Sequence, residues 1–208
     1  FPLTGRPPLQ KEDWLSLYQK AKDYGLNHFR FHSWCPPEAA FAAADEIGMY
    51  LQVELPHWSL KVGEDEKTWK FLNSEADKII ADYGHHPSFI FMSMGNELEG
   101  DFGKLNELVS TLKEKDSRHL YATTSFSFQT PVGKRPEPED EFFVTQWTDK
   151  GWIRGQGVFN EFSPNFKTDY SENSTHIETP LISHEIGQYS VYPDISEIEK
   201  YTGVLQPL

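Results

Sequence analysis

Two glutamates that follow apolar runs are the residues of this sequence best suited to chemistry. Glu97 ends the run Phe89–Glu97, and Glu185 stands within Leu181–Gln188, directly after a serine and a histidine. Burial of a carboxyl group at a strand end raises its pKa, and a raised pKa suits a general acid near neutral pH. We therefore predict an acid–base role for Glu97. For each glutamate the alternative is a solvated carboxylate that follows a strand and has no chemical role.

A basic residue and three histidines also lie within or after predicted strands. Arg30 is expected in a buried strand, where an unpaired charge is costly, so it needs an anionic partner such as Glu54 or Glu185. A purely structural ion pair would explain Arg30 as well. None of the histidines has the i, i+4 spacing with a carboxylate that marks a zinc site, so we predict no metal centre and expect hydroxyl contacts or core hydrogen bonds. These histidines are His32, His57 and His184.

Strand and helix patterns alternate through most of the chain, which is typical of parallel βαβ units. The predicted helices begin at Asp13 as an N-cap, after Pro36-Pro37, at Glu66 and near Leu105. No glycine-rich phosphate loop follows a strand, so a doubly wound nucleotide-binding sheet is disfavoured. Polar residues follow many different strands, which favours a parallel (β/α)8 TIM barrel. The six predicted strands are Leu26–Ser33, Met49–Leu55, Phe89–Glu97, Leu120–Phe126, Glu141–Thr148 and Leu181–Gln188.

The composition limits the kinds of molecule that the chain is expected to bind. The 208 residues, 38% of them hydrophobic, suit one domain over 1–208. The net charge of −13 disfavours nucleic acid and anionic membranes, and no apolar run reaches the length of a membrane span. No cofactor motif is present. The single cysteine, Cys35, cannot form an internal disulfide, so the compartment stays open, with a periplasmic or secreted bacterial protein as the favoured setting.

Three segments together resemble glycoside hydrolase family 2, which includes β-galactosidases, β-glucuronidases and β-mannosidases. They are Gly25–His32 (Gly-Leu-Asn-His-Phe-Arg-Phe-His), Ala44–Met49 (Ala-Asp-Glu-Ile-Gly-Met), and His86–Ile90 (His-Pro-Ser-Phe-Ile) leading to Gly-Asn-Glu at 95–97. The resemblance covers nearly the whole chain. It implies a TIM-barrel catalytic domain that hydrolyses β-glycosidic bonds with retention, by a two-glutamate double displacement, and that needs no cofactor. A β-galactosidase-like carbohydrate substrate is expected.

The resemblance also assigns roles to particular residues. In the family, the acid/base glutamate ends the fourth barrel strand and the nucleophile ends the seventh, which implies Glu97 and Glu185. Asn96 would donate a hydrogen bond to the sugar 2-hydroxyl, and Arg30 would support the nucleophile. Two tryptophans in the second half could stack on a sugar ring or simply pack in the protein. They are Trp147 and Trp152.

The sequence departs from the family pattern in three places. The family commonly has histidine three residues after the strand-two arginine, whereas His32 is two residues after Arg30. His85 stands where the family usually has asparagine. The tyrosine expected near the nucleophile is not identified within 129–179. The sequence therefore predicts the reaction type more closely than the identity of the sugar.

The chain is shorter than a complete barrel, which usually takes about 250 residues. By the resemblance, its strands correspond to barrel strands two to seven, with strand one expected before Phe1 and strand eight after Leu208. We expect an opening between the strands at Leu26–Ser33 and Leu181–Gln188, covered by a partner or by a second copy in a homo-oligomer. The alternative functions are a carbohydrate-binding or catalytically weak barrel fragment and an unrelated α/β enzyme.

Overall fold

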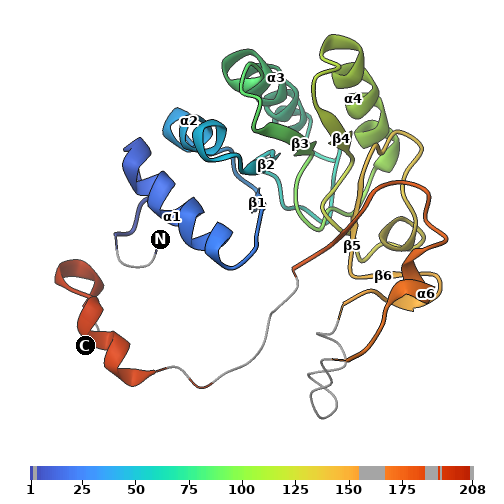
Figure 1. The fold of residues 1–208 in the computed structure, drawn as a ribbon. Coiled ribbons are helices and arrows are strands. Elements are labelled where there is room, and N and C mark those ends of the chain that lie inside the picture. The colour runs from blue at the N-terminus through green and yellow to red at the C-terminus, as the bar shows by residue number, and fades with distance from the viewer. Residues whose placement is uncertain (2–3, 155–166, 186–191, 193, 207–208) are drawn as a thin grey trace.

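The computed structural model describes residues 1, 4–154, 167–185, 192 and 194–206 (Figure 1). The first two thirds of the chain alternate helices and parallel strands, as the sequence predicts. The elements of this part are α1 (Lys11–Asp23), β1 (His28–Phe31), α2 (Glu38–Ile47), β2 (Tyr50–Glu54), α3 (Glu66–Tyr83), β3 (Phe89–Ser93), α4 (Phe102–Lys115) and β4 (Leu120–Ala122).

The remaining described elements span two to six residues each. They are the 3-10 helix η1 (Val132–Lys134), β5 (Phe143–Thr145), β6 (Trp147–Thr148), β7 (Gly151–Trp152), α6 (Ser171–Ser174), β8 (Leu181–Ser183), and the 3-10 helices η2 (Ile195–Lys200) and η3 (Gly203–Leu205). The segment 149–179 contains β7 and α6 in its described part, and residues 155–166 lie outside the described residues. Within the described residues, no helix is long and apolar enough to cross a membrane.

Strands β1 to β4 form one parallel sheet in the order β1-β2-β3-β4. Beyond β4 the parallel arrangement continues through isolated bridges, from Asn96 to Ser125 and from Ser125 to Val144 in β5. Strand β5 then pairs in parallel with β8. Six parallel strands thus follow one another around an arc, which is the α/β arrangement of an incomplete barrel.

The arc stays open between its first and last strands in the described part of the chain. There, β1 pairs with β2 alone and β8 pairs with β5 alone. A cavity of about 370 Å³ lies between them, lined from one side by His28 and Arg30 and from the other by Ile182 and Ser183. The opening lies where the sequence predicts it. Whether further strands fill it in a longer chain stays a prediction.

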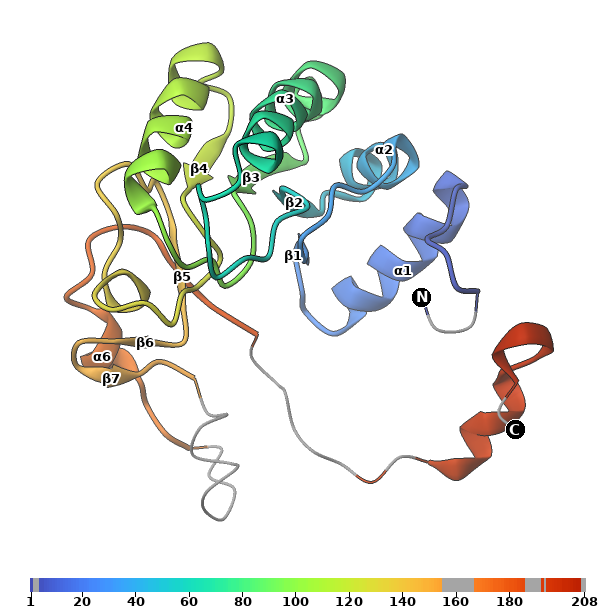
Figure 2. The same ribbon diagram turned by 180° about the vertical axis from the view of Figure 1, so that it is seen from behind.

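The main core lies between the β1–β4 sheet and the helices that cover its outer face (Figures 1 and 2). Helix α3 has the predicted bounds, and its buried residues Leu72, Ala76 and Ile79 repeat at helical spacing. Asp65 caps this helix, because its side chain accepts hydrogen bonds from the backbone N–H groups of Lys67 and Thr68. The apolar face of α3 therefore packs in the core.

Several predicted boundaries are wrong. Helix α1 begins at Lys11 after Gln10, so Asp13 is not the N-cap; it lies in the first turn, where the helix dipole favours an acidic side chain. Each predicted strand is longer than the observed one. Strand β3 ends at Ser93, and Glu97 lies four residues further along, because the chain leaves the sheet to make a turn. Likewise β8 ends at Ser183, and residues 186–188 of the last predicted strand lie outside the described residues.

Candidate active site

The loop after β3 carries Glu97 and is fixed by backbone contacts. Gly95 has a φ of +145°, and a Cβ there would lie 2.3 Å from the carbonyl oxygen of His57, so only glycine fits. The same carbonyl accepts a hydrogen bond from the N–H of Asn96 at 3.0 Å, and the N–H of Glu97 bonds to the Ser125 carbonyl at 3.1 Å. Backbone hydrogen bonds from neighbouring loops at the strand ends therefore fix the backbone of Asn96 and Glu97.

Glu185 follows β8 in a similar way. The N–H of His184 donates to the Thr145 carbonyl at 2.8 Å, and Nη1 of Arg154 donates to the carbonyl of Glu185. The φ angles of Glu97 and Glu185 are +48° and +49°, in the left-handed region that non-glycine residues rarely adopt. Such a conformation costs about 1–3 kcal/mol and is concentrated at functional sites. The fold therefore holds both carboxylates in strained positions.

The two side chains meet although 88 residues separate them in the sequence. A carboxylate oxygen of Glu97 lies within 4.8 Å of one of Glu185. Burial raises the pKa of Glu97, and the charge of Glu185 raises it further, while His32, Arg30 and Arg154 act in the opposite direction. The predicted direction of this pKa shift and burial as its cause are confirmed, and the charge of Glu185 is a second cause. The pair thus contains one carboxyl group that tends to keep its proton.

Arg30 joins three acidic or amide groups from different strand ends. Its Nη1 donates to Oε1 of Glu54 at 2.6 Å and to Oδ1 of Asn96 at 3.1 Å, and its Nη2 donates to Oε1 of Glu185 at 2.9 Å. Glu54 is fully buried and also accepts from the N–H of Ser33 at 2.6 Å. Both partners that the sequence offered for Arg30 are therefore used. The arginine ties the first strand of the arc to the last.

The hydrogen bonds around Asn96 leave only one arrangement of donors and acceptors. Arginine can only donate, so the Asn96 atom that faces Arg30 must be the oxygen. His184 Nε2, 3.1 Å from the same oxygen, must then carry the proton. His184 Nδ1 accepts from Nε2 of Gln146 at 3.2 Å. This leaves Nδ2 of Asn96 as a buried donor without a partner among the described residues.

His184 is suited to this neutral state. It is buried, and burial, aided by the charges of Arg30, Arg154 and His32, lowers its pKa to about 2. Glu97, His184 and Glu185 also place one potential metal-ligand atom each within 4.8 Å of one another. Both ring nitrogens of His184 already take part in hydrogen bonds with protein side chains, so the cluster suits proton and nucleophile chemistry better than metal binding.

His32 also reaches the pair of glutamates. Its Nε2 lies 4.0 Å from Oε1 of Glu185, and its side chain is 40% exposed. Trp58 packs edge-on against the His32 ring, with centroids 5.3 Å apart, and is 63% exposed. An exposed tryptophan beside a carboxylate pair is a candidate ligand platform. The sequence analysis did not select Trp58, although its position shortly after the β2 strand end was a usable signal.

The other predicted binding residues, described next, make contacts of a different kind. The ring of His57 is buried, which lowers its pKa, and His57 shapes the site through its backbone carbonyl. Trp147 and Trp152 form a T-shaped pair with centroids 5.0 Å apart on the β6–β7 hairpin, where both line a groove of about 430 Å³. Trp147 also packs on Phe126, whose ring stacks on His184. The contacts of Trp147 thus support the packing alternative, and those of Trp152 place it beside this second groove.

Sequence reasoning missed two buried polar residues of the site. The side chain of Gln146 reaches the site through its hydrogen bond to His184, and Arg154 stands in the segment 149–179, where no pattern assigned any role. Gln146 lies near the end of the predicted strand Glu141–Thr148, and this position was a weak signal. For Arg154 the sequence offered none.

The sequence relative and the structural neighbours described below carry the names of glycosidases. No family model matches the chain. A protein of Formosa agariphila assigned as a β-glucuronidase is 27% identical over 189 residues, which cover 85% of this chain and 22% of that protein. The chain thus spans about a fifth of the length of this curated relative.

Solved structures of glycosidases share the fold. A β-glucuronidase from Faecalibacterium prausnitzii L2-6 matches 65% of the chain and 22% of its own length, with a TM-score of 0.57 and 21% identity. A β-glucuronidase from Bacteroides uniformis matches 60% and 17%, with a TM-score of 0.52 and 20% identity. A β-D-mannosidase from Dictyoglomus thermophilum matches 62% and 18%, with a TM-score of 0.52 and 16% identity. The chain therefore has the α/β arrangement of TIM-barrel glycosidases over these shares.

Proposed function

We propose that this chain is part of the catalytic domain of a retaining β-glycosidase of glycoside hydrolase family 2. The observation that carries the proposal is the approach of Glu97 and Glu185 to within 4.8 Å at two different strand ends. Retaining glycosidases hold their two carboxyl groups about 5–5.5 Å apart, whereas inverting enzymes need about 6.5–9.5 Å to admit a water molecule. The observed separation supports the retaining geometry.

In the first step, Glu97 acts as the general acid. Its raised pKa keeps the proton that must pass to the glycosidic oxygen as that bond breaks. The Glu185 carboxylate attacks the anomeric carbon from the opposite face, and the leaving group departs as a neutral alcohol. Arg30, 2.9 Å from Glu185, holds the attacking carboxylate in position. The product of this step is a glycosyl ester on Glu185.

In the second step, the roles are reversed. Glu97, now ionised, takes a proton from a water molecule, and the resulting hydroxide equivalent attacks the anomeric carbon. The ester bond breaks and Glu185 leaves as a carboxylate, so both side chains return to their starting states. Two inversions give net retention.

Asn96 fits a substrate-binding role in this scheme. Its oxygen is occupied by Arg30 and His184, so its Nδ2 is the atom that can donate to a sugar hydroxyl. We assign this donor to the sugar 2-hydroxyl. We also assign His32 and Trp58, which lie at the exposed side of Glu185, to contacts with the remainder of a carbohydrate.

The identity of the sugar is a separate part of the proposal. The sequence predicts a β-galactosidase-like substrate, and the related proteins that match carry the names β-glucuronidase and β-mannosidase. A test must therefore include β-galactosides, β-glucuronides and β-mannosides. A homo-oligomer across the opening between β1 and β8 stays a prediction.

The decisive experiment compares the full-length protein with its Glu185→Gln variant on aryl β-glycosides of these three sugars. We expect hydrolysis of one class with retained anomeric configuration, followed by NMR, and loss of activity in the variant. A slow 2-fluoro substrate should leave a glycosyl adduct on Glu185, detected by mass spectrometry. The matched control is Glu46→Gln, at an exposed glutamate whose partner is Lys11. Unchanged hydrolysis in Glu185→Gln would refute the proposal, and carbohydrate binding without hydrolysis would favour the non-catalytic alternative.

A further inference from the structure

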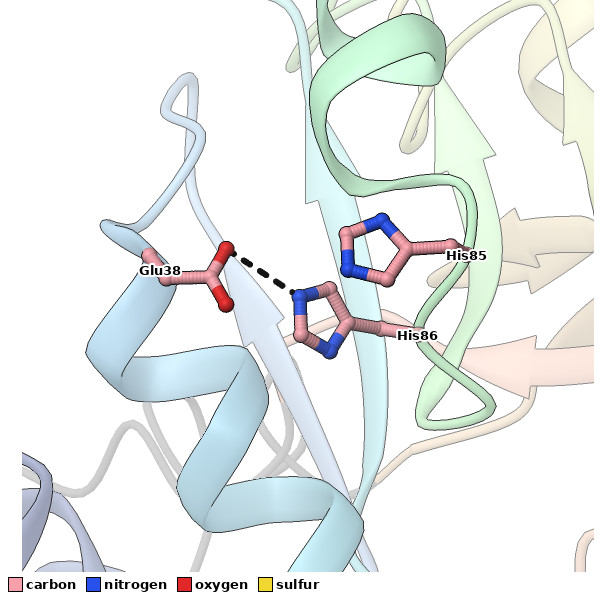
Figure 3. Close-up of side chains that lie close together, drawn as sticks. All are labelled: Glu38, His85 and His86. Carbon is pink, nitrogen blue, oxygen red and sulfur yellow. Dashed lines mark hydrogen bonds and ion pairs between the residues drawn. The ribbon is translucent and has the colours of Figure 1, made fainter.

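A second cluster of ionisable side chains lies outside the candidate active site (Figure 3). Glu38 begins α2, and His85 and His86 form the turn between α3 and β3. One ligand atom from each residue lies within 4.8 Å of the other two. Two imidazoles and one carboxylate form a donor set that zinc uses in proteins. The cluster plays no part in the proposed glycosidase chemistry.

The distances suit a tetrahedral ion. His86 Nε2 and Glu38 Oε2 are 3.1 Å apart. Two ligands at about 2.0–2.1 Å from a tetrahedral Zn²⁺ are about 3.3 Å apart, so this pair already has nearly the spacing of one tetrahedral edge. A small movement would let both atoms face the same ion.

His86 is held as a metal-binding histidine usually is. Its Nδ1 lies 2.6 Å from Oδ2 of Asp45, whose other oxygen accepts from the N–H of Ser88 at 2.9 Å. A carboxylate on one ring nitrogen fixes the tautomer and turns the lone pair of the other nitrogen toward the metal. The ring is only 6% exposed and stacks on Phe41, with centroids 5.2 Å apart. It is therefore a rigid ligand.

His85 and Glu38 provide the open side of the cluster. The His85 ring lies beside that of His86, with centroids 4.1 Å apart, and one of its nitrogens faces the gap toward His86 and Glu38 (Figure 3). His85 is exposed and the Glu38 side chain is 61% exposed, so an ion can reach the site from solvent. Three protein ligands leave the fourth position for water.

We propose that Glu38, His85 and His86 bind a zinc-class divalent cation, with Asp45 orienting His86. The ion ties the start of α2 to the turn that leads into β3, and so stabilises the helix-covered half of the arc. The competing explanation of the close contact between His86 and Glu38 is a proton shared by the two side chains. Only the metal site requires His85.

The test uses the metal-free chain titrated with Zn²⁺ in a calorimeter, and with Co²⁺ to record the absorption of a tetrahedral complex. We expect one bound ion per chain, a higher Tm in the presence of Zn²⁺, and no comparable effect of Mg²⁺. His85→Ala and Glu38→Gln alter exposed residues, so they should fold, and each should weaken binding by at least about 10-fold. Asp45→Asn should weaken it by about 10–100-fold.

His176→Ala is the matched control, since it removes an exposed histidine outside the cluster. It should leave Zn²⁺ affinity unchanged. The proposal is overturned if the folded wild-type chain shows no saturable Zn²⁺ binding at micromolar concentrations. It is overturned as well if His85→Ala binds as tightly as wild type, because the contact between His86 and Glu38 then belongs to a shared proton and the bound ion lies elsewhere.

Discussion

The β1–β4 sheet and the β5–β8 pair hold their catalytic candidates by different means. In the first region, four residues of β2 are fully buried, and one large core cluster runs through the sheet and α1–α4. In the second, all three residues of β8 are only partly buried, and the associated core cluster consists of Ala122, Phe142 and Val144. The first region is stabilised by apolar packing and the second depends more on polar contacts.

This difference shows how the site is assembled. Glu97 is placed by the backbone of the well-packed region, through Gly95 and the Ser125 carbonyl. Glu185 is tied to that region by side chains, through Arg30 and through the contact of His184 with Asn96. Breaking these polar links should therefore disturb Glu185 before it disturbs Glu97.

The largest effect is expected from Arg30→Leu, which removes the ion pair between the two regions. It leaves the buried Glu54 carboxylate without its cation, which should lower the free energy of unfolding by about 3–5 kcal/mol. Urea unfolding measures this change. The control Arg135→Leu breaks an exposed pair with Asp149 and should cost less than about 1 kcal/mol. Equal midpoints for the two variants would contradict the central role of Arg30.

Glu97→Gln tests the glutamate that belongs to the well-packed β1–β4 region. General acid catalysis contributes about 10²–10⁴-fold, so kcat/KM in the full-length protein should fall by this factor for substrates with poor leaving groups. Burial and Glu185 raise the pKa of Glu97, so the basic limb of the wild-type pH–rate profile should lie above the usual range of a glutamic acid. The basic limb should disappear in the variant. A basic limb that persists unchanged in Glu97→Gln would exclude Glu97 as the acid.

A pair of truncations compares the two cores directly. Leu72→Ala removes a fully buried side chain of α3 and should lower the free energy of unfolding by about 2–5 kcal/mol. Ile182→Ala removes a partly buried side chain of β8 and should cost about 1 kcal/mol. Urea unfolding of both variants tests the difference. If the two truncations cost the same, the second region is as well packed as the first.

Because His184 is neutral in the folded chain, the free energy of unfolding should depend on pH in the acid range. Its pKa is lowered to about 2 in the folded chain, whereas the unfolded side chain titrates near about 6.5, so the unfolded state binds the proton first as the pH falls. The free energy of unfolding should decrease by about 1 kcal/mol per pH unit between about pH 6.5 and 4.5. His184→Asn should show a shallower dependence, and His176→Asn, at an exposed position, should behave as wild type. A slope unaffected by His184→Asn would assign the acid sensitivity to other groups.

The smallest effect is expected for the aromatic residues. Trp58→Ala removes an exposed ring beside His32 and should raise KM about 2- to 10-fold with little change in kcat, because a stacking contact contributes about 0.5–1.5 kcal/mol. Trp152→Ala, on the β6–β7 hairpin, should change KM less. Steady-state kinetics on aryl glycosides measures both. The reverse order would identify the groove beside the hairpin as the substrate platform.

Local patterns along the chain were enough to predict the alternating helices and strands and to select the two glutamates as candidates. Helix α3 matches its predicted bounds, because apolar spacing, the Asp65 cap and Gly84 are local features of the chain. The assignment of Glu97 and Glu185 as acid/base and nucleophile candidates also rested only on strand ends and a family resemblance. The ends of the strands were less predictable, because a strand ends where its neighbours cease to pair with it.

The contacts that the side chains of the site make could be read only from the fold. Arg30 bonds to Asn96, 66 residues away, and to Glu185, 155 residues away, and no local pattern encodes such distances. The same holds for the bond of Gln146 to His184, for the backbone role of His57 and for the packing of Trp147 on Phe126. Periodicity is set by neighbours in the chain, whereas hydrogen-bond partners are set by the strands that the fold brings side by side.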